Sequence, residues 1–345
     1  QVFGLVPADL SHAGLALAVA REGGTALLAL EFAASAARVQ AQFERLLAGT
    51  RGRVGLRVGP SQVALARALV ALAQDRELCV VLSGPATGLR HLREAVGLRE
   101  GDTCLAEILA AEDAEIAASL CDGLLARGHE AGGWVSEDSS FILLQKLHDR
   151  VSTPVYVQGG IGVRTAAACR VAGAAGVVLD DCLLLVAESP LPAALQQDLS
   201  RLNGAECKLF GELIGRPCRA FGRPGSAALK AAEELQRCAE GGELELEDWI
   251  AQTQASLGWG RQGLLPLGQG IGLAAQYRDT YRHAGRLVQA VDVPSVSSLG
   301  DEFIISTCAA LSRCSGLPAP YLTHVTTVVQ NQLRMTTLPM APTLA

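Results

Sequence analysis

Short apolar runs alternate with helix-like stretches eight times within about the first 185 residues, at spacings of about 22 to 35 residues. Such alternation is typical of a parallel sheet whose strands are joined by helices. Eight units predict an α/β chain with a closed (β/α)8 TIM barrel, and a doubly wound open sheet is the alternative, because strand number alone does not close a barrel. The expected strands are Val2–Val6, Thr25–Phe32, Val54–Val58, Leu78–Leu82, Thr103–Leu109, Gly123–Gly128, Pro154–Val157 and Gly176–Leu179.

The pattern changes after the eighth strand, so residues 1–186 are interpreted as the part that holds the barrel strands. Residues 187–265 are expected to form a mainly helical insertion. It is either a lid over the C-terminal ends of the strands or a second lobe that only packs there. Residues 266–291 are expected to close the barrel with one helix, Ile271–Val291. Residues 292–345, rich in Ser, Thr and Pro toward the end, are expected to be a linker and a C-terminal tail.

Glycine-rich loops follow the sixth and seventh expected strands. The first contains Gly132 and Gly133, and the second is Gln158-Gly159-Gly160-Ile161-Gly162. Parallel α/β proteins build ligand sites just past the C-terminal ends of their strands. Two such loops at equivalent positions favour an anionic cofactor, which backbone N–H groups and the N-terminus of the next helix would hold. The alternative is that the glycines only allow tight turns between strand and helix.

Composition excludes several other classes of function. The net charge is −6 and the arginines are scattered, which gives no electrostatic footprint for nucleic acid. The ten cysteines include no C-x-x-C pair, so we expect a reducing, cytoplasmic location and no metal site. No apolar stretch is long enough to span a membrane. The chain starts at Gln1, already within an expected strand, and we expect it to be part of a longer polypeptide.

Three motifs together, E-A-G-G at 130–133, Q-G-G-I-G at 158–162 and P-L-G-Q-G at 266–270, resemble the nitronate monooxygenase (2-nitropropane dioxygenase) superfamily. The sequence around them is most similar to domains of this kind embedded in large bacterial polyketide and polyunsaturated-fatty-acid-type synthases. The resemblance implies an FMN-dependent TIM-barrel oxidoreductase, either an enoyl reductase or a nitronate monooxygenase. Its substrates would be carrier-bound acyl chains, and its partners an acyl carrier protein and neighbouring synthase domains.

The resemblance also implies a set of site residues. The FMN phosphate would lie against the second glycine loop and the end of strand eight, and Arg164 could add a charge-assisted contact. Two glycines of the first loop would pass under the isoalloxazine edge, and the closing segment would contribute three residues. His129 is the candidate catalytic proton donor, because it is the only histidine in the motif loops. The implied cofactor-binding residues are Gly132, Gly133, Gln158, Gly159, Gly160, Gly162, Asp181, Gly268, Gln269 and Gly270.

Four positions depart from the pattern of the resembling enzymes. Trp134 stands where they commonly have histidine, and Ala8 where a methionine follows proline. Glu107 stands near the place of a lysine, and Asp181 near that of Thr or Ser beside the phosphate. A carboxylate against a phosphate dianion is repelled by about 1 kcal/mol even in water. These departures support a second hypothesis, a catalytically degenerate barrel kept as a structural or docking domain of a megasynthase. A phosphosugar-binding barrel without flavin is a third.

Overall fold

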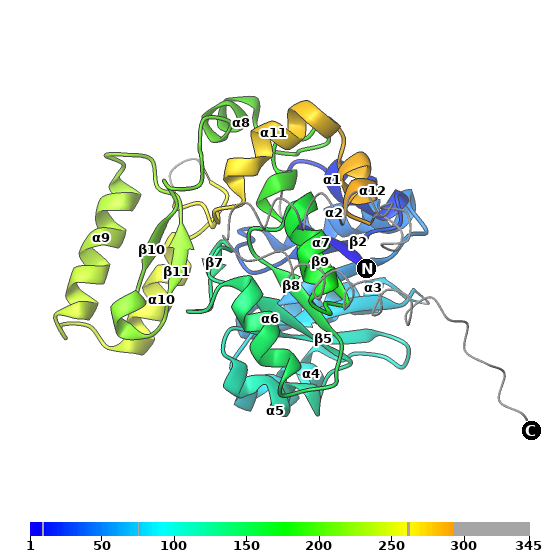
Figure 1. The fold of residues 1–345 in the computed structure, drawn as a ribbon, viewed down its shortest axis with the longest axis horizontal. Helices are drawn as coiled ribbons and strands as arrows, with labels where there is room; N and C mark the ends of the chain where they lie inside the picture. Colours follow the sequence, from blue (N-terminus) through cyan, green and yellow to red (C-terminus); the bar gives the residue numbers. More distant parts are fainter. Residues whose placement is uncertain (9, 75, 261–262, 293–345) are drawn as a thin grey trace, which may run out of the picture. The chain divides into compact units, whose positions relative to one another are not determined.

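Eight parallel strands close into a barrel, which confirms the predicted (β/α)8 fold and excludes the open sheet (Figure 1). The computed structural model describes residues 1–8, 10–74, 76–260 and 263–292. The barrel closes where the first strand pairs with the last, with Phe3 opposite Val178. The strands, in their order around the barrel, are β1 (Val2–Pro7), β2 (Thr25–Ala29), β3 (Val54–Val58), β4 (Leu78–Leu82), β5 (Thr103–Ile108), β6 (Gly123–Arg127), β8 (Val155–Gln158) and β9 (Gly176–Leu179).

The helices that follow these strands pack around the barrel. Two of them start at serine caps, with Ser35 accepting from the Arg38 amide and Ser139 from the Ile142 amide. The helices are α1 (Gly14–Arg21), α2 (Ala36–Gly49), α3 (Val63–Leu72), α4 (Leu89–Val96), α5 (Ala114–Ala118), α6 (Ser140–His148) and α7 (Val163–Val171). None of the helices in the described ranges is both long and apolar enough to cross a membrane.

The barrel interior is packed in layers. One buried apolar cluster contains Phe3, Leu27, Leu105, Leu125 and Val178, contributed by five different strands. A second and larger cluster lies between the strands and the surrounding helices. Side chains two residues apart on a strand point to the same face. The next layer toward the C-terminal end of the barrel therefore consists of the residues two positions after the members of the first cluster.

The segment between β9 and the closing helices forms a lobe beside the barrel mouth. Most of it lies on the left of Figure 1, and its first helix lies at the top, beside the first closing helix. It contains a three-stranded antiparallel sheet, in which β11 lies between β10 and β7, a strand contributed by the loop after β6. Sequence patterns do not predict this sheet, because strands of two or three residues between glycines and prolines carry no periodic signal. The lobe elements are α8 (Ala193–Leu199), β10 (Lys208–Phe210), β11 (Cys218–Ala220), α9 (Ala227–Glu240) and α10 (Leu246–Ser256), with β7 at Gly133–Trp134.

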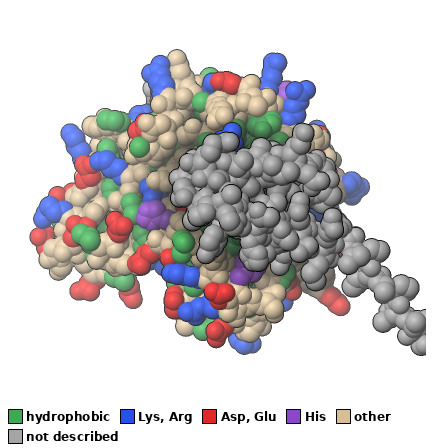
Figure 2. Space-filling view, viewed as in Figure 1, with side chains coloured by type: hydrophobic (Ala, Val, Ile, Leu, Met, Phe, Trp, Pro, Cys, Tyr) green, Lys and Arg blue, Asp and Glu red, His purple; other side chains and the backbone are tan. Residues whose placement is uncertain are grey.

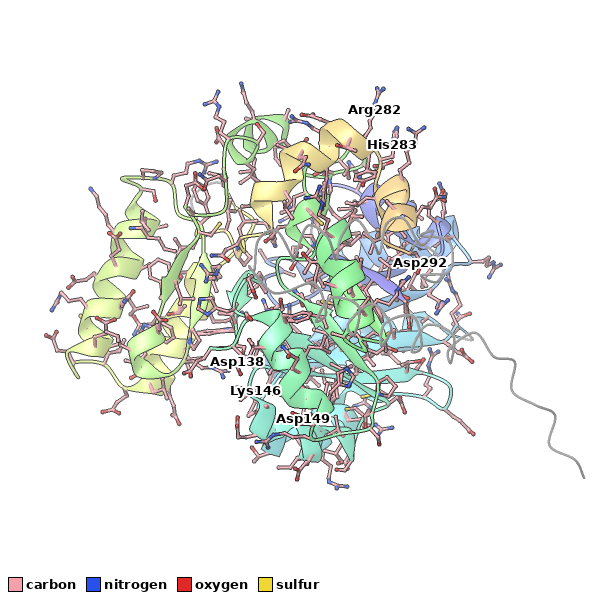
Figure 3. All side chains as sticks on the ribbon, viewed as in Figure 1. Asp138, Lys146, Asp149, Arg282, His283 and Asp292 are labelled. Carbon is pink, nitrogen blue, oxygen red and sulfur yellow. The ribbon has the colours of Figure 1, made fainter. Side chains whose placement is uncertain are left out.

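Two helices, rather than the single expected one, close the barrel. They are α11 (Ile271–Tyr281) and α12 (Ala284–Val291), and α12 contacts both α7 and α1. The break falls at Arg282, which has a φ of 60° (Figure 3). The Glu188 carboxylate accepts from the Ala284 amide at 3.0 Å and lies 2.8 Å from His283 Nδ1. It therefore binds a backbone amide at the N-terminal end of α12. One compact unit spans Gln1–Val291, and the expected tail, apart from residue 292, lies outside the described residues.

Candidate functional site

Six ionisable side chains lie together at the C-terminal end of the barrel. Glu107, Arg127 and Asp180 each follow by two residues an apolar side chain that points into the lumen, so they point inward one layer higher. All six are at least nine-tenths buried. We call this group the charged layer, and its members are Glu31, Arg57, Glu107, Arg127, Asp180 and Asp181.

Arg57 is the centre of the ion pairs in this layer. Its Nη2 atom lies 2.6 Å from Glu107 Oε2 and 3.0 Å from Glu31 Oε2. Its Nε atom donates to Ser83 Oγ at 3.0 Å. The arginine side chain is 2% exposed, so water does not screen these pairs. Breaking a buried pair by removing one partner costs about 3–5 kcal/mol.

Arg127 joins the charged layer to the first glycine loop. Its Nη1 atom donates to Glu107 Oε1 at 3.3 Å, and its Nη2 atom donates to the carbonyl of Gly132. A Cβ atom at Gly133 would lie 2.6 Å from that Nη2 atom, and one at Gly132 would lie 2.2 Å from the Pro266 carbonyl oxygen. These two glycines therefore allow protein atoms to approach the loop from both sides.

Asp180 and Asp181 hold the opposite side of the mouth. Gln158 Nε2 donates to Asp180 Oδ2 at 3.2 Å, and the Gly268 amide donates to Asp181 Oδ2 at 2.7 Å. The Asp181 carboxylate thus accepts the hydrogen bond of the Gly268 backbone amide. Gly268 is one of the residues that the resemblance implies for cofactor binding. Gly270 lies beside the same two aspartates, whereas Gln269 is exposed and its amide donates to the Glu130 carbonyl.

Four carboxyl groups share this buried layer with two guanidinium groups, and each of the four has a raised pKa. Burial raises the pKa of Glu107 to about 7 and is also the main cause of the raised pKa values of Glu31 and Asp180. For Asp181, burial and the neighbouring charge of Asp180 act together and raise the pKa well above its usual value. Burial and the excess of acids over arginines thus both favour the protonated form of these carboxyl groups.

The second glycine loop packs against the protein itself. Gly159 has a φ of 116°, and a Cβ there would lie 3.0 Å from the Ala131 amide nitrogen. A Cβ at Gly162 would lie 2.2 Å from the hydroxyl of Tyr277 on α11. That hydroxyl also accepts from the Val163 amide at 2.9 Å, at the start of α7. The geometry is that of close packing between loops, and Arg164 on α7 is exposed.

Trp134, at the position where the resembling enzymes have histidine, fastens the lobe to the barrel. Its Nε1 atom donates to Gln254 Oε1 at 2.7 Å, and its ring packs edge-on against Trp249 with centroids 5.5 Å apart. Gln254 in turn donates to the carbonyl of Glu31 at 3.0 Å. The Gln254 side chain therefore connects the lobe both to Trp134, in the loop after β6, and to Glu31 of the charged layer.

His129 does not line the mouth. Its Nδ1 atom lies 3.2 Å from the Ser136 carbonyl oxygen, and its own carbonyl accepts from Arg219. Nearby, Lys146 and Asp138 form a surface ion pair at 2.7 Å (Figure 3). The histidine is thus held by neighbouring loops, and its predicted catalytic role stays a prediction.

The space left at the mouth is a cavity of about 40 Å³. Small-molecule sites usually have about 300–1,000 Å³. Four buried atoms of residues that line the cavity have no hydrogen-bond partner among the described residues: Glu31 Oε2, Arg57 Nη2, Arg127 Nε and Gln158 Oε1. The first two of these belong to the ion pairs described above. Both polar side chains and apolar ones, such as Leu5 and Phe32, line this space. The side chains at the mouth, as they are placed, leave less space than the ring system of the flavin that the resemblance implies.

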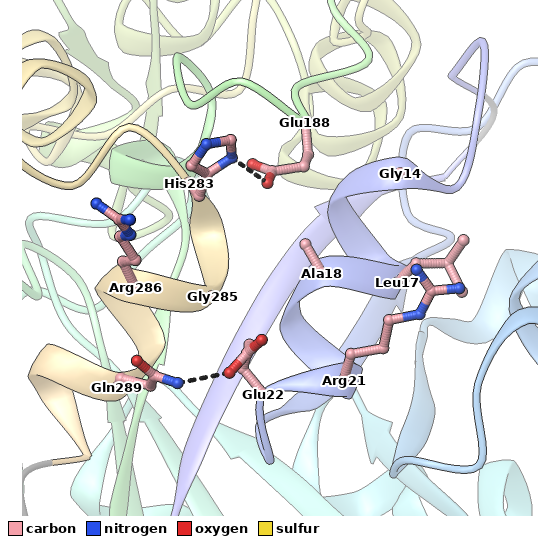
Figure 4. A pocket seen from close by; sticks show the side chains of 10 residues that line it. All are labelled: Gly14, Leu17, Ala18, Arg21, Glu22, Glu188, His283, Gly285, Arg286 and Gln289. Carbon is pink, nitrogen blue, oxygen red and sulfur yellow. Dashed lines mark hydrogen bonds and ion pairs between the residues drawn. The ribbon is translucent and has the colours of Figure 1, made fainter.

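A larger cavity, of about 600 Å³, lies outside the barrel between α1 and α12 (Figure 4). The Glu22–Gln289 pair joins the end of α1 to α12, and the Glu188–His283 pair borders the cavity just before α12. Arg21 and Arg286 also line the cavity. Within the described ranges, no group of three or more His, Cys, Asp or Glu could hold a metal ion.

Charged and polar side chains cover the visible surface without a continuous basic area among the described atoms (Figure 2). Sequence reasoning missed Glu31, Arg57 and Arg127 as members of the site. The available signal was a single charged residue at the end of an otherwise apolar strand, as in V-G-L-R-V and G-L-L-A-R. This signal could not show which charged side chains form ion pairs with one another.

A family model described as nitronate monooxygenase matches residues 69–272. The structure of FabK from Thermotoga maritima is similar, with a TM-score of 0.65, 19% identity, and coverage of 84% of this chain and 90% of that one. A nitroalkane oxidase from Streptomyces ansochromogenes has a TM-score of 0.59 at 22% identity, covering 84% and 94%. The enoyl reductase domain of MlnA comes from the macrolactin biosynthesis cluster of Bacillus amyloliquefaciens. It has a TM-score of 0.62 and 11% sequence identity, and the match covers 84% of this chain and 92% of that one. No curated protein sequence matches. At these identities the structural likeness shows the fold.

Proposed function

Since the chain belongs to the nitronate monooxygenase family, with the barrel fold of its oxidoreductases, we propose that it is a degenerate member whose mouth is closed to flavin. On this proposal the domain has a structural or docking role within a polyketide-type synthase. The observation that carries the proposal is the charged layer, which fills the mouth and leaves about 40 Å³. The likeness to the MlnA domain supports the synthase context.

Flavin binding at the mouth would oppose the buried ion pairs. A ring placed there would displace Arg57 and Arg127 from Glu31 and Glu107. Leaving a buried carboxylate without its partner costs about 3–5 kcal/mol. That cost offsets about half of the roughly 8 kcal/mol that micromolar binding releases. The phosphate would also need to replace the Asp181 carboxylate at the Gly268 amide.

Titration of FMN fluorescence with the full-length purified protein tests the proposal. We expect no saturable quenching at micromolar protein and no yellow colour after purification. A variant with the mouth emptied, Arg127→Ala combined with Asp181→Ser, provides the comparison. Saturable FMN binding by the wild-type protein, with release of FMN on denaturation, would contradict the proposal.

An FMN-dependent oxidoreductase acting on carrier-bound enoyl chains is the second candidate. The meeting of the glycine loops at the mouth favours it, because Gly132 contacts the Pro266 carbonyl and Gly159 contacts Ala131. This candidate requires the charged layer to open when flavin binds. NADPH oxidation that depends on both added FMN and an enoyl thioester would support it over the structural role.

A further inference from the structure

A pair of cysteines lies at the opposite end of the barrel from the charged layer. Cys104 is the second residue of β5, and Cys121 precedes β6 by two residues. Their Sγ atoms are 3.3 Å apart and buried. Among the described residues all cysteines are free thiols. The pair encloses α5, so a bond between the two would close one strand–helix unit of the barrel.

Backbone pairing holds the two thiols in place. The Asp122 amide donates to the Cys104 carbonyl at 2.8 Å, and the Cys104 amide donates to Asp122 Oδ2 at 2.7 Å. In the adjacent parallel strands, Leu105 is opposite Gly123. A disulfide has an S–S length of about 2.05 Å, so the sulfurs need to approach by only about 1.3 Å. Small rotations of the side chains can supply that movement.

The two thiols are chemically different. Cys121 is 8% exposed and Cys104 is fully buried. The hydrogen bond that Cys104 donates to Cys121 lowers the pKa of Cys121, and the Arg93 charge on α4 acts in the same direction. The same contact raises the pKa of Cys104. Cys121 therefore has the lower pKa and is the more accessible of the two, as expected for an attacking cysteine.

We propose that Cys104 and Cys121 form a redox modification site, at which a hydroperoxide converts the two thiols into an internal disulfide. The Cys121 sulfur attacks the terminal oxygen of the hydroperoxide and the O–O bond breaks. The other oxygen leaves as an alcohol that carries the Cys121 proton, and a sulfenic acid remains on Cys121. The sulfur of Cys104 then attacks the Cys121 sulfur. The S–S bond forms, the S–O bond breaks, and water leaves with the Cys104 proton. The thiols lose two electrons and the peroxide gains them.

Peptide mapping of the full-length protein tests the site directly. Trypsin cleaves after Arg99 and Arg127, so both cysteines lie on the single peptide 100–127, which contains no other cysteine. After graded hydrogen peroxide, alkylation and digestion without reductant, we expect this peptide to lose two hydrogens and to carry no alkyl group. Dithiothreitol should restore double alkylation. The thermal midpoint of the oxidised protein should rise by roughly 5 °C, because the bond closes a loop in the unfolded chain.

Three variants separate this reaction from general oxidation. Cys104→Ser should leave a sulfenic acid on Cys121 that dimedone traps, and Cys121→Ser should leave Cys104 unmodified. Cys238→Ser removes a partly exposed cysteine and should change nothing at peptide 100–127. Peptide 100–127 fully alkylated after peroxide has oxidised Cys238 would overturn the proposal. None of these readouts depends on whether the barrel mouth binds flavin.

Discussion

At the scale of single residues, the pKa values in the charged layer determine how stability depends on pH. Glu107 has a folded pKa of about 7, raised by burial above its ordinary value of 4.5. The folded protein therefore binds this proton more tightly than the unfolded chain. Its contribution to stability is fully present below about pH 4.5 and is lost as the pH rises to about 7.

The variant Glu107→Gln should remove that part of the pH dependence. We expect the loss in unfolding free energy between pH 4.5 and 7 to become smaller, by at most about 3 kcal/mol. Urea denaturation at several pH values measures it. Glu115→Gln, which changes an exposed glutamate on α5, is the control and should keep the wild-type slope. An unchanged slope in Glu107→Gln would mean that the proton resides elsewhere in the layer.

Arg57→Met should destabilise the protein strongly, because it leaves Glu31 and Glu107 without their closest cation. We expect a loss of about 3–5 kcal/mol at neutral pH, partly recovered in the double variant with Glu107→Gln. Lys146→Met breaks the exposed pair with Asp138 and should cost less than about 1 kcal/mol. Equal effects of the two single variants would refute a buried network.

At the scale of elements, short segments from distant parts of the chain hold the lobe and the loops together. Strand β7 comes from the loop after β6 and pairs with β11, so Trp134 lies opposite Cys218. Helix α11 meets the start of α7 through Tyr277 and Val163. These contacts use the Val163 amide and hold the loops after β6 and β8 against β11 and α11.

Trp134→His, which introduces the residue common in the resembling enzymes, should loosen the lobe. It removes the packing on Trp249 and the bond to Gln254, and we expect a loss of about 2–4 kcal/mol. Faster hydrogen exchange in α9 and α10 is the measurement. Trp134→Phe keeps a ring and should have a smaller effect. If Trp134→His exchanges like the wild type, the lobe is held by other contacts.

Gly162→Ala should destabilise the junction of α7 and α11, since its Cβ would lie 2.2 Å from the Tyr277 hydroxyl. We expect about 1–3 kcal/mol, reduced when Tyr277→Phe is added. Gly258→Ala serves as a control, because nothing lies within 4 Å of a Cβ there. Thermal unfolding of the four proteins compares them. Failure of Tyr277→Phe to reduce the loss would place the conflict elsewhere.

At the scale of the whole molecule, barrel and lobe belong to one compact unit, Gln1–Val291. The lobe residues Leu264 and Leu265 are buried, and Phe221 pairs with Leu265 next to the closing segment. Shared burial couples the two parts, so they should unfold together.

A fragment of residues 1–292 should therefore fold by itself and melt in a single transition. Circular dichroism should report helix loss at the same midpoint as the near-ultraviolet signal of the lobe residues Trp134 and Trp249. The full-length protein is the comparison. Two separate transitions would show that the lobe is an independent domain.

The sequence by itself determined the eight strand–helix units and the resemblance to the family, because alternation and glycine motifs are local patterns. It also brought Gly132, Gly159 and Gly268 to one end of the barrel. The pairing of β1 with β9 in the tertiary structure decided that the sheet closes. Only the tertiary structure decided that Arg57 and Arg127 meet Glu31 and Glu107 there. Such pairing depends on the register of several strands and on which inward side chain reaches which neighbour. Local sequence does not encode that geometry, so the same motifs are compatible with an open mouth or a closed one.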